Sequence, residues 1–142
     1  MRALLDVNLL LALFDPAHTH HARSVSWWQG QASGGWASCP LTQNGFVRVV
    51  SRASYPRPAR LPDALQLLRA WAVPPRHEFW PDDLSLLDET YIDHSRLLGP
   101  NQITDIYLLA LAVKNGGRLV TFDRGVTIAA VKGAKAKNLV VL

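Results

Sequence analysis

Residues 3–14 read ALLDVNLLLALF, and this stretch decides the expected fold. Its start, Ala3–Leu5, is a short apolar run of the kind that forms a buried strand, and residues 8–14 predict a helix directly after it. Residues 119–122, LVTF, and residues 139–142, LVVL, predict further buried strands because they are rich in valine and leucine. Strands separated by helices are typical of a parallel sheet, so the sequence predicts an α/β protein.

The rest of the chain alternates in the same way. Residues 36–38 and 77–80 predict two more strands. A helix is expected to begin at Pro16 and to carry Trp27 and Trp28, and another to begin at about Leu41, with Thr42 as a possible cap. Further helices are expected over residues 62–71, from Asp82 and Asp83 to about Asp93, and over Ile103–Lys114. Residues 51–62, rich in proline and arginine, predict an exposed loop. We expect one domain over residues 1–142, an α/β/α sandwich around a central, mostly parallel sheet.

The composition excludes several classes of protein. A hydrophobic content of 49% with 18% charged residues is that of a folded domain and excludes a disordered chain. A single cysteine, Cys39, excludes an internal disulfide framework and favours a reducing compartment. The apolar start resembles a signal peptide, but Asp6 and Asn8 interrupt it, and no run approaches the length of a membrane span. We therefore expect a soluble, cytoplasmic protein with no membrane partner.

Positive charge points to an anionic partner. The net charge is +4, and eleven of the fifteen basic residues are arginine, which suits bidentate phosphate contacts. A bias of the genome toward arginine codons would produce the same excess, so charge alone does not decide. The candidates for contacts with a nucleic-acid backbone are Arg48, Arg52, Arg57 and Arg60. Arg48 and Arg52 have the spacing of one helix face, and the other two lie in the expected loop.

Three aspartates are expected at one edge of the sheet. Asp6 directly follows the first strand and Asp123 follows the strand at residues 119–122, so both lie at carboxyl ends of strands. Asp105 lies in the first turn of a helix that runs back to the Asp123 strand, and such a helix begins at the same edge. Ligands of parallel α/β proteins bind at this edge. The sequence therefore predicts a site formed by three acids that are distant in the chain.

A divalent cation would explain such a cluster, because like charges repel and burial adds a desolvation cost. Oxygen ligands select Mg²⁺ or Mn²⁺, and such ions can activate water against a phosphodiester. Each acid also has a structural interpretation. Asp6 and Asp105 could cap helices, and Asp123 before Arg124 and Gly125 could form a turn.

The segments LLDVNLLLALFDP, NQITDIYLLALAVKNGG and LVTFDRG, in this order, resemble the PIN domain. With CPLTQNGFVRVVS and FWPDDLSLLD they resemble the VapC-type toxins of bacterial toxin–antitoxin pairs, in their mycobacterial-type branch. The resemblance covers essentially the whole chain. It implies an α/β/α sandwich, Mg²⁺- or Mn²⁺-dependent cleavage of RNA, a homodimer and a VapB-type antitoxin.

The resemblance also assigns roles to residues. It makes Asp6, Asp105 and Asp123 the catalytic and metal-binding acids, with Thr121 supporting the last acid and Asn8 beside the first. Gln43 stands where the family usually has a glutamate. We interpret Gln43 as a neutral residue that orients water beside one tightly bound metal, which leaves the number of metals open.

Alternatives remain for the function and for the basic residues. A PIN-like module could bind RNA or a partner without cleaving, and a flap-type DNA nuclease would share the acidic cleft. The arginines could contact antitoxin instead of RNA. His18, His20 and His21 could bind a metal, but an exposed position at the start of the second helix, where they could contact RNA phosphates, is favoured. Four of the five tryptophans, Trp27, Trp28, Trp71 and Trp80, are expected in the core or at interfaces, rather than stacked on bases. The target RNA and its cleavage site cannot be read from the sequence.

Overall fold

A five-stranded parallel sheet organises the protein in the computed structural model, which describes residues 1–142 except for the side chain of Ala32. The strands are β1 (Ala3–Leu5), β2 (Trp36–Ser38), β3 (His77–Phe79), β4 (Arg118–Thr121) and β5 (Leu139–Val141). Their order is β3-β2-β1-β4-β5, and every neighbouring pair is parallel. The first strand along the chain is thus the central one, and its carboxyl end has neighbours on both sides. The prediction of an α/β fold with a parallel sheet is confirmed.

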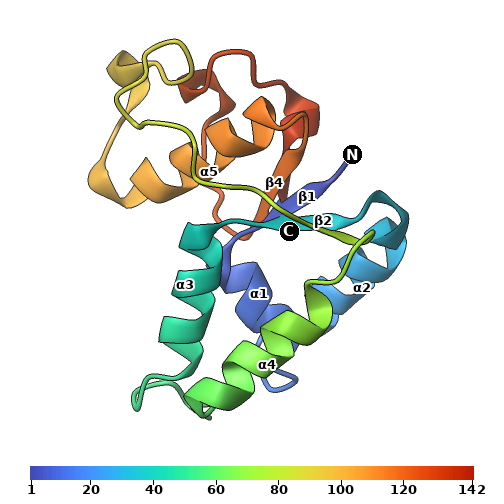
Figure 1. The fold of residues 1–142 in the computed structure, drawn as a ribbon. Helices are drawn as coiled ribbons and strands as arrows, with labels where there is room; N and C mark the ends of the chain where they lie inside the picture. The colour runs from blue at the N-terminus through green and yellow to red at the C-terminus, as the bar shows by residue number, and fades with distance from the viewer.

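The helices lie on both sides of this sheet (Figure 1). They are α1 (Val7–Phe14), α2 (His21–Gln31), α3 (Pro40–Val50), α4 (Leu61–Trp71) and α5 (Ile103–Lys114), with five short 3₁₀ segments in the connections. Figure 1 shows α1 to α4 on one side and α5 with the later connections on the other. Two apolar cores match this division. One packs Leu4 and Leu119 against α5, and the other packs Leu5 and Val120 against α1 and α3.

The elements that carry the acids were predicted closely. The expected strand at Ala3–Leu5 and helix at Ile103–Lys114 have the observed bounds, and the strand expected at 119–122 is shifted by one residue. Helix α1 begins at Val7 and α2 at His21, five residues after Pro16. Helix α3 begins at Pro40, so Thr42 is not its cap residue. Thr42 instead lies in the first turn, where its Oγ1 accepts a hydrogen bond from the backbone nitrogen of Cys39 at 3.0 Å.

The helix expected from Asp82 to about Asp93 does not form. This segment consists of turns and one isolated antiparallel bridge between Ile92 and Val131. The side chain of Asp82 accepts a hydrogen bond from the backbone nitrogen of Leu41 at 3.1 Å, so it contacts the start of α3 and not its own segment. Asp88 binds the backbone and side chain of Thr90. Side chains that bind nearby backbone groups compete with helix formation, and this segment forms turns in place of the expected helix.

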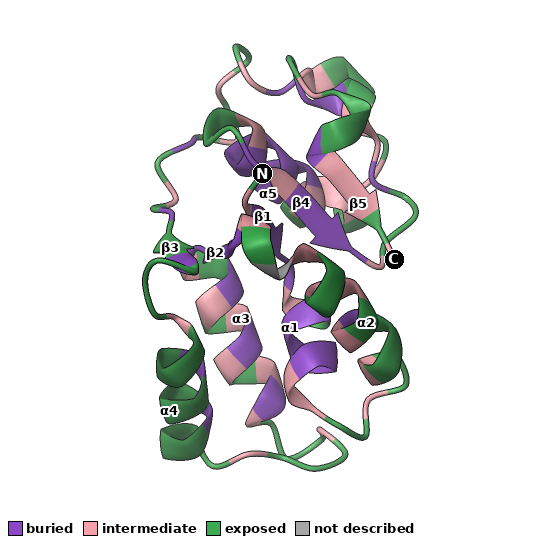
Figure 2. Ribbon diagram, turned by 90° about the vertical axis from the view of Figure 1, so that its right-hand side faces the viewer, coloured by how far each residue is buried: buried purple, intermediate pink, exposed green. Residues whose placement is uncertain are grey.

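Helix α4 is the most exposed of the helices (Figure 2). Only Ala64 and Leu68 of this helix are buried, whereas Leu61 and Leu65 keep about half of their surface in water at 57% and 48%. Across the described chain, no helix combines the length and the apolar character that crossing a membrane requires.

Candidate active site at the carboxyl edge of the sheet

Asp6 is the most deeply held of the three acids. It follows β1 and is only 4% exposed. Its backbone nitrogen donates to the carbonyl of Val120 in β4 at 3.3 Å, and its Oδ1 caps α1 by accepting from the backbone nitrogen of Leu9 at 2.6 Å. Its Oδ2 accepts from the Thr121 hydroxyl at 2.6 Å. Both carboxylate oxygens are therefore oriented by the protein.

Thr121 connects Asp6 to Asp123. Its hydroxyl donates to Asp6 and accepts from the backbone nitrogen of Asp123 at 3.0 Å. Asp123 is exposed, and its Oδ1 accepts from the backbone nitrogen of Gly125 at 2.6 Å, which is the turn foreseen for this sequence. One buried hydroxyl thus fixes the relative positions of two acids that are 117 residues apart in the numbering of the chain.

Asp105 completes the group. It lies half-buried in the first turn of α5 and does not cap that helix, whose cap residue is Gln102. Its carboxyl lies close enough to Asp6 and Asp123 for both to raise its pKa. The structure therefore brings the three predicted aspartates together at one edge of the sheet.

The electrostatics of the group reflect this crowding. Burial raises the pKa of Asp6 to about 6, and the charge of Asp123 adds to the rise against the hydrogen bonds from Thr121 and Leu9. Burial also raises the pKa of Asp105 to about 7, with further contributions from Asp6 and Asp123. A carboxylate near like charges favours its protonated form unless a cation compensates. A cation bound at this site would therefore favour the charged forms of these carboxylates.

The donor set fits a hard divalent cation. Each of the three side chains offers only oxygen, and burial with the nearby like charges disfavours the charged forms of Asp6 and Asp105. In the arrangement described, no three His, Cys, Asp or Glu side chains of the described residues converge closely enough to hold an ion together. Asp6 is engaged by Leu9 and Thr121, and Asp123 by Gly125. The three acids are therefore neighbours, but their side chains do not converge on one point in this arrangement.

Gln43 lies in α3 and contacts Ser38, a residue that the sequence did not mark as part of the site. Its Nε2 donates to the hydroxyl of Ser38 at 2.9 Å, and that hydroxyl also bonds Nε2 of His77 at 2.8 Å. Ser38 and His77 are both buried. A polar residue at the last position of a predicted buried strand was the only signal that could have marked Ser38. Asn8, the other residue assigned beside Asp6, is exposed in the first turn of α1.

Of the four candidate arginines, Arg48 lies in the last turn of α3 and the other three lie in the segment between α3 and α4. All four side chains are exposed. The expectation that Arg48 and Arg52 share one helix face is wrong, because α3 ends at Val50 and Arg52 lies in the segment that follows. One of the four arginines has an acidic neighbour, since Nη2 of Arg57 lies 3.6 Å from Oδ1 of Asp15. Asp15 itself ends α1 and accepts from the Tyr55 hydroxyl at 2.6 Å, which places it away from the acidic group.

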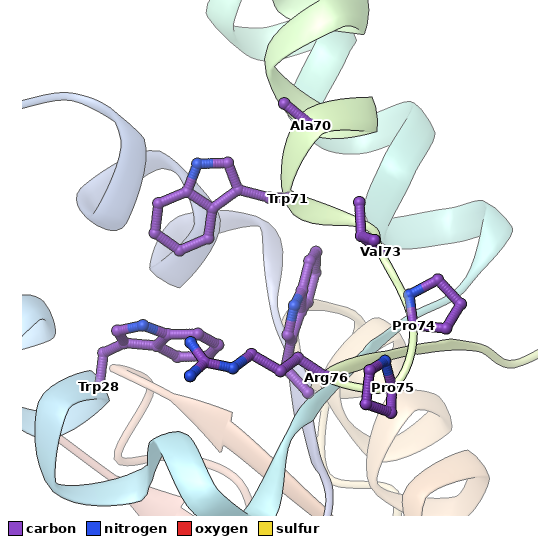
Figure 3. Close-up of a pocket in the computed structure, with 8 residues that line it drawn as sticks. Trp28, Ala70, Trp71, Val73, Pro74, Pro75 and Arg76 are labelled. Atoms are coloured by element: carbon purple, nitrogen blue, oxygen red, sulfur yellow. The ribbon is translucent and has the colours of Figure 1, made fainter.

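An aromatic pocket of about 490 Å³ lies at the opposite end of the strands (Figure 3). Trp28, Trp36 and Trp71 line it, together with the segment that leads from α4 to β3 and includes Arg76. Figure 3 shows Trp71 on α4 and Pro74, Pro75 and Arg76 in that segment. Trp80 is buried in the core. The tryptophans are thus divided between the core and a surface pocket.

The fold and these residues define an α/β protein with an acidic site at the carboxyl edge of its sheet, and comparison with known proteins narrows the class. The family model of the PIN domain matches residues 3–132. Ribonuclease VapC44 of Mycobacterium tuberculosis is 52% identical over 142 residues, which is the full length of both chains. Ribonuclease VapC38 of the same organism is 46% identical over 125 residues, 87% of this chain and 86% of that one.

A solved structure shares the fold. The crystal structure of VapBC2 from Rickettsia felis bound to a promoter DNA fragment covers 87% of this chain and 89% of its own, with a TM-score of 0.56 and 14% identity. The chain therefore belongs to the PIN-domain family and, within it, to the VapC proteins.

Proposed function

We propose that this protein is an endoribonuclease that requires Mg²⁺ or Mn²⁺ and acts as the toxin of a toxin–antitoxin pair. The observation that carries the proposal is the arrangement of Asp6, Thr121 and Asp123 with Asp105 beside them. The names of its relatives, ribonucleases VapC44 and VapC38, support RNA as the substrate. The excess of arginine agrees with a polyanionic substrate.

Asp6, Asp105 and Asp123 would hold the metal. When bound, the ion supplies positive charge that positions a water and stabilises the charge that develops on the phosphodiester. The protein's own contribution is orientation. The backbone of Leu9 and the hydroxyl of Thr121 fix the two oxygens of Asp6, and the same hydroxyl fixes the backbone of Asp123. Burial and repulsion from Asp6 and Asp123 both disfavour the charged form of Asp105, so a cation would favour it.

Gln43 would orient water at the rim of this site. Its amide nitrogen is occupied by Ser38, which leaves the amide oxygen to accept a hydrogen bond from water. We propose that one metal binds tightly in this protein and that the second binds weakly or only with RNA. Metal titration by calorimetry of the wild type against Gln43→Glu tests this, and an unchanged stoichiometry and affinity would remove the idea.

The proposed partners are RNA, a VapB-type antitoxin and a second copy of this chain. The structural neighbour with the same fold is a VapBC complex, which supports an antitoxin partner. Co-expression with the adjacent open reading frame, followed by size-exclusion chromatography with light scattering, would detect both the complex and the homodimer. We place the protein in the cytoplasm, where its RNA substrates are found.

The decisive experiment uses Asp105→Asn. We expect induced expression of the wild type to stop growth and to produce defined RNA ends, and the variant to cleave at least about a hundredfold more slowly. A binding module that does not cleave would keep its effect on growth in the variant. A flap-type nuclease would instead prefer branched DNA over single-stranded RNA. Mapping of RNA ends after induction distinguishes these three functions.

A further inference from the structure

Beyond the acidic group, one exposed aromatic side chain contacts the segment that carries Asp123. His20 precedes α2, and its ring stacks on Phe122 with a centroid separation of 4.7 Å and an interplanar angle of 31°. Phe122 directly follows Thr121 and directly precedes Asp123. Consecutive Cα atoms are about 3.8 Å apart, so the stack lies on the order of 10 Å from the acids. A nucleotide next to the scissile phosphate, or one removed from it, would reach this position.

The backbone of His20 is firmly held. Its nitrogen donates to Nδ1 of His18 at 3.1 Å, and its carbonyl accepts from both the backbone nitrogen and the hydroxyl of Ser24, at 3.0 and 2.9 Å. Ser24 is completely buried. The imidazole side chain is nevertheless exposed. The half-buried Phe122 lies against its ring, and the ring of His18 lies 5.8 Å from it between centroids. His20 therefore presents an exposed ring on a fixed backbone.

We propose that His20, supported by Phe122, is a stacking platform for a base of the RNA substrate near the cleaved bond. Single-stranded nucleic acids are commonly held by stacking of their bases on exposed aromatic side chains. The proposal rests on the ribonuclease function and names a contact that contributes to substrate binding. It replaces a metal-binding interpretation of the three histidines, since His18 binds the backbone of His20 and His21 binds the carbonyl of Ala12 at 2.7 Å.

The test measures binding without cleavage. All proteins carry Asp105→Asn, and fluorescence anisotropy gives the Kd for a short fluorescein-labelled oligoadenylate and for an abasic ribose-phosphate strand of equal length. We expect His20→Ala to raise the Kd for oligoadenylate about tenfold and to leave that for the abasic strand unchanged. His20→Phe, which keeps an aromatic ring, should retain the original affinity for oligoadenylate. Thr19→Ala, at an exposed residue in the same loop, is the matched control.

Two results would overturn the platform. An equal loss of affinity for both oligonucleotides would mean that His20 acts through the fold or through charge. No loss of affinity for either would mean that His20 does not contact the base. The assay needs no cleavage, so it is independent of the test of Asp105. Cleavage by the wild type together with unchanged binding by His20→Ala would retain the ribonuclease and remove only the platform.

Discussion

At the scale of single residues, the Thr121 hydroxyl affects both the position and the pKa of the acids in the site. It is buried, donates to Asp6 and accepts from the backbone of Asp123. The side-chain bond from Thr121 lowers the pKa of Asp6, against the larger effect of burial. Removing it therefore affects both the fold and the acidity of the site.

We predict that Thr121→Val, which keeps the shape of the side chain, lowers the free energy of unfolding by about 1–3 kcal/mol, because it leaves a buried carboxylate and an amide without their partner. It should also raise the pKa of Asp6 further and weaken divalent-metal binding. Chemical denaturation and metal titration measure these effects. Thr121→Ser, which keeps the hydroxyl, is the control, and equal losses in both variants would contradict the prediction.

The sequence predicted the acids well and their neighbours poorly. Asp6 was interpreted either as a helix cap or as a site residue, and in the structure it caps α1 while it lies among the other acids. Position at a strand end was enough to place it. Gln43 was placed by resemblance, but it bonds Ser38, and the further bond from Ser38 to His77 depends on the pairing of β2 with β3, which no local pattern reveals.

At the scale of elements, the contact between α1 and α3 positions the start of α1. Gly45 lies in the middle of α3, and a Cβ atom added there would be 2.4 Å from Cγ2 of Val7. Val7 directly follows Asp6, and its β-branched side chain has little freedom to move away. The absence of a side chain at residue 45 thus lets α3 approach the residue next to the acidic site.

We predict that Gly45→Ala lowers the free energy of unfolding by about 1–3 kcal/mol and reduces RNA cleavage as well, because α1 must shift at the end that carries Asp6. Gly30→Ala in α2 is the matched control, since nothing lies within 4 Å of its added Cβ, and it should be neutral or stabilise by up to about 1 kcal/mol. Thermal unfolding and initial cleavage rates give both values. Equal stability of the two variants would refute the steric argument.

Elements with strong apolar character were predicted within a few residues, whereas residues 82–93 were not. That segment was assigned to a helix from two acidic residues followed by leucines. Its aspartates bind other partners, Asp82 at the start of α3 and Asp88 in a local turn. The choice between a helix cap and a tertiary contact depends on where the chain returns in space, which the sequence does not contain.

At the scale of the whole molecule, the crowded acids make stability depend on pH and on metal. The pKa of Asp6 is raised to about 6 and that of Asp105 to about 7, from an ordinary value of 3.8. A raised pKa means that the folded state binds protons more tightly than the unfolded state. This contribution is complete below about pH 4 and is lost as the pH rises through 6 and 7.

We predict that the metal-free protein loses about 2–4 kcal/mol of this contribution between pH 5 and pH 8, and that Mg²⁺ or Mn²⁺ restores stability at pH 8. His18 and His77 have lowered pKa values, mainly because of burial, and they oppose the trend by stabilising the fold as the pH rises. The difference between the wild type and Asp105→Asn in EDTA cancels their effect. Denaturant midpoints that give a difference independent of pH would contradict this prediction.

The arginines of α3 and the following loop should act on RNA through charge. We predict that combined replacement of Arg48, Arg52 and Arg60 by alanine weakens RNA binding and reduces the slope of log K against log salt by about 0.7 for each phosphate that these arginines neutralise. Arg96→Ala, at an arginine paired with Asp93 at 3.3 Å, is the control. Anisotropy titrations over a range of salt measure the slope, and an unchanged slope would argue for an antitoxin contact at these residues.

The double engagement of Asp6 has a consequence for genetics. Its carboxylate starts α1 and anchors Thr121, so replacing it damages both the folded chain and its chemistry, whereas Asp105 caps nothing. Among cells selected to survive expression of the gene, changes at Asp105 should therefore leave abundant protein that still captures antitoxin. Changes at Asp6 should leave little protein. Two substitutions that look equivalent in a survival assay would then differ in their effect on the free antitoxin in the cell.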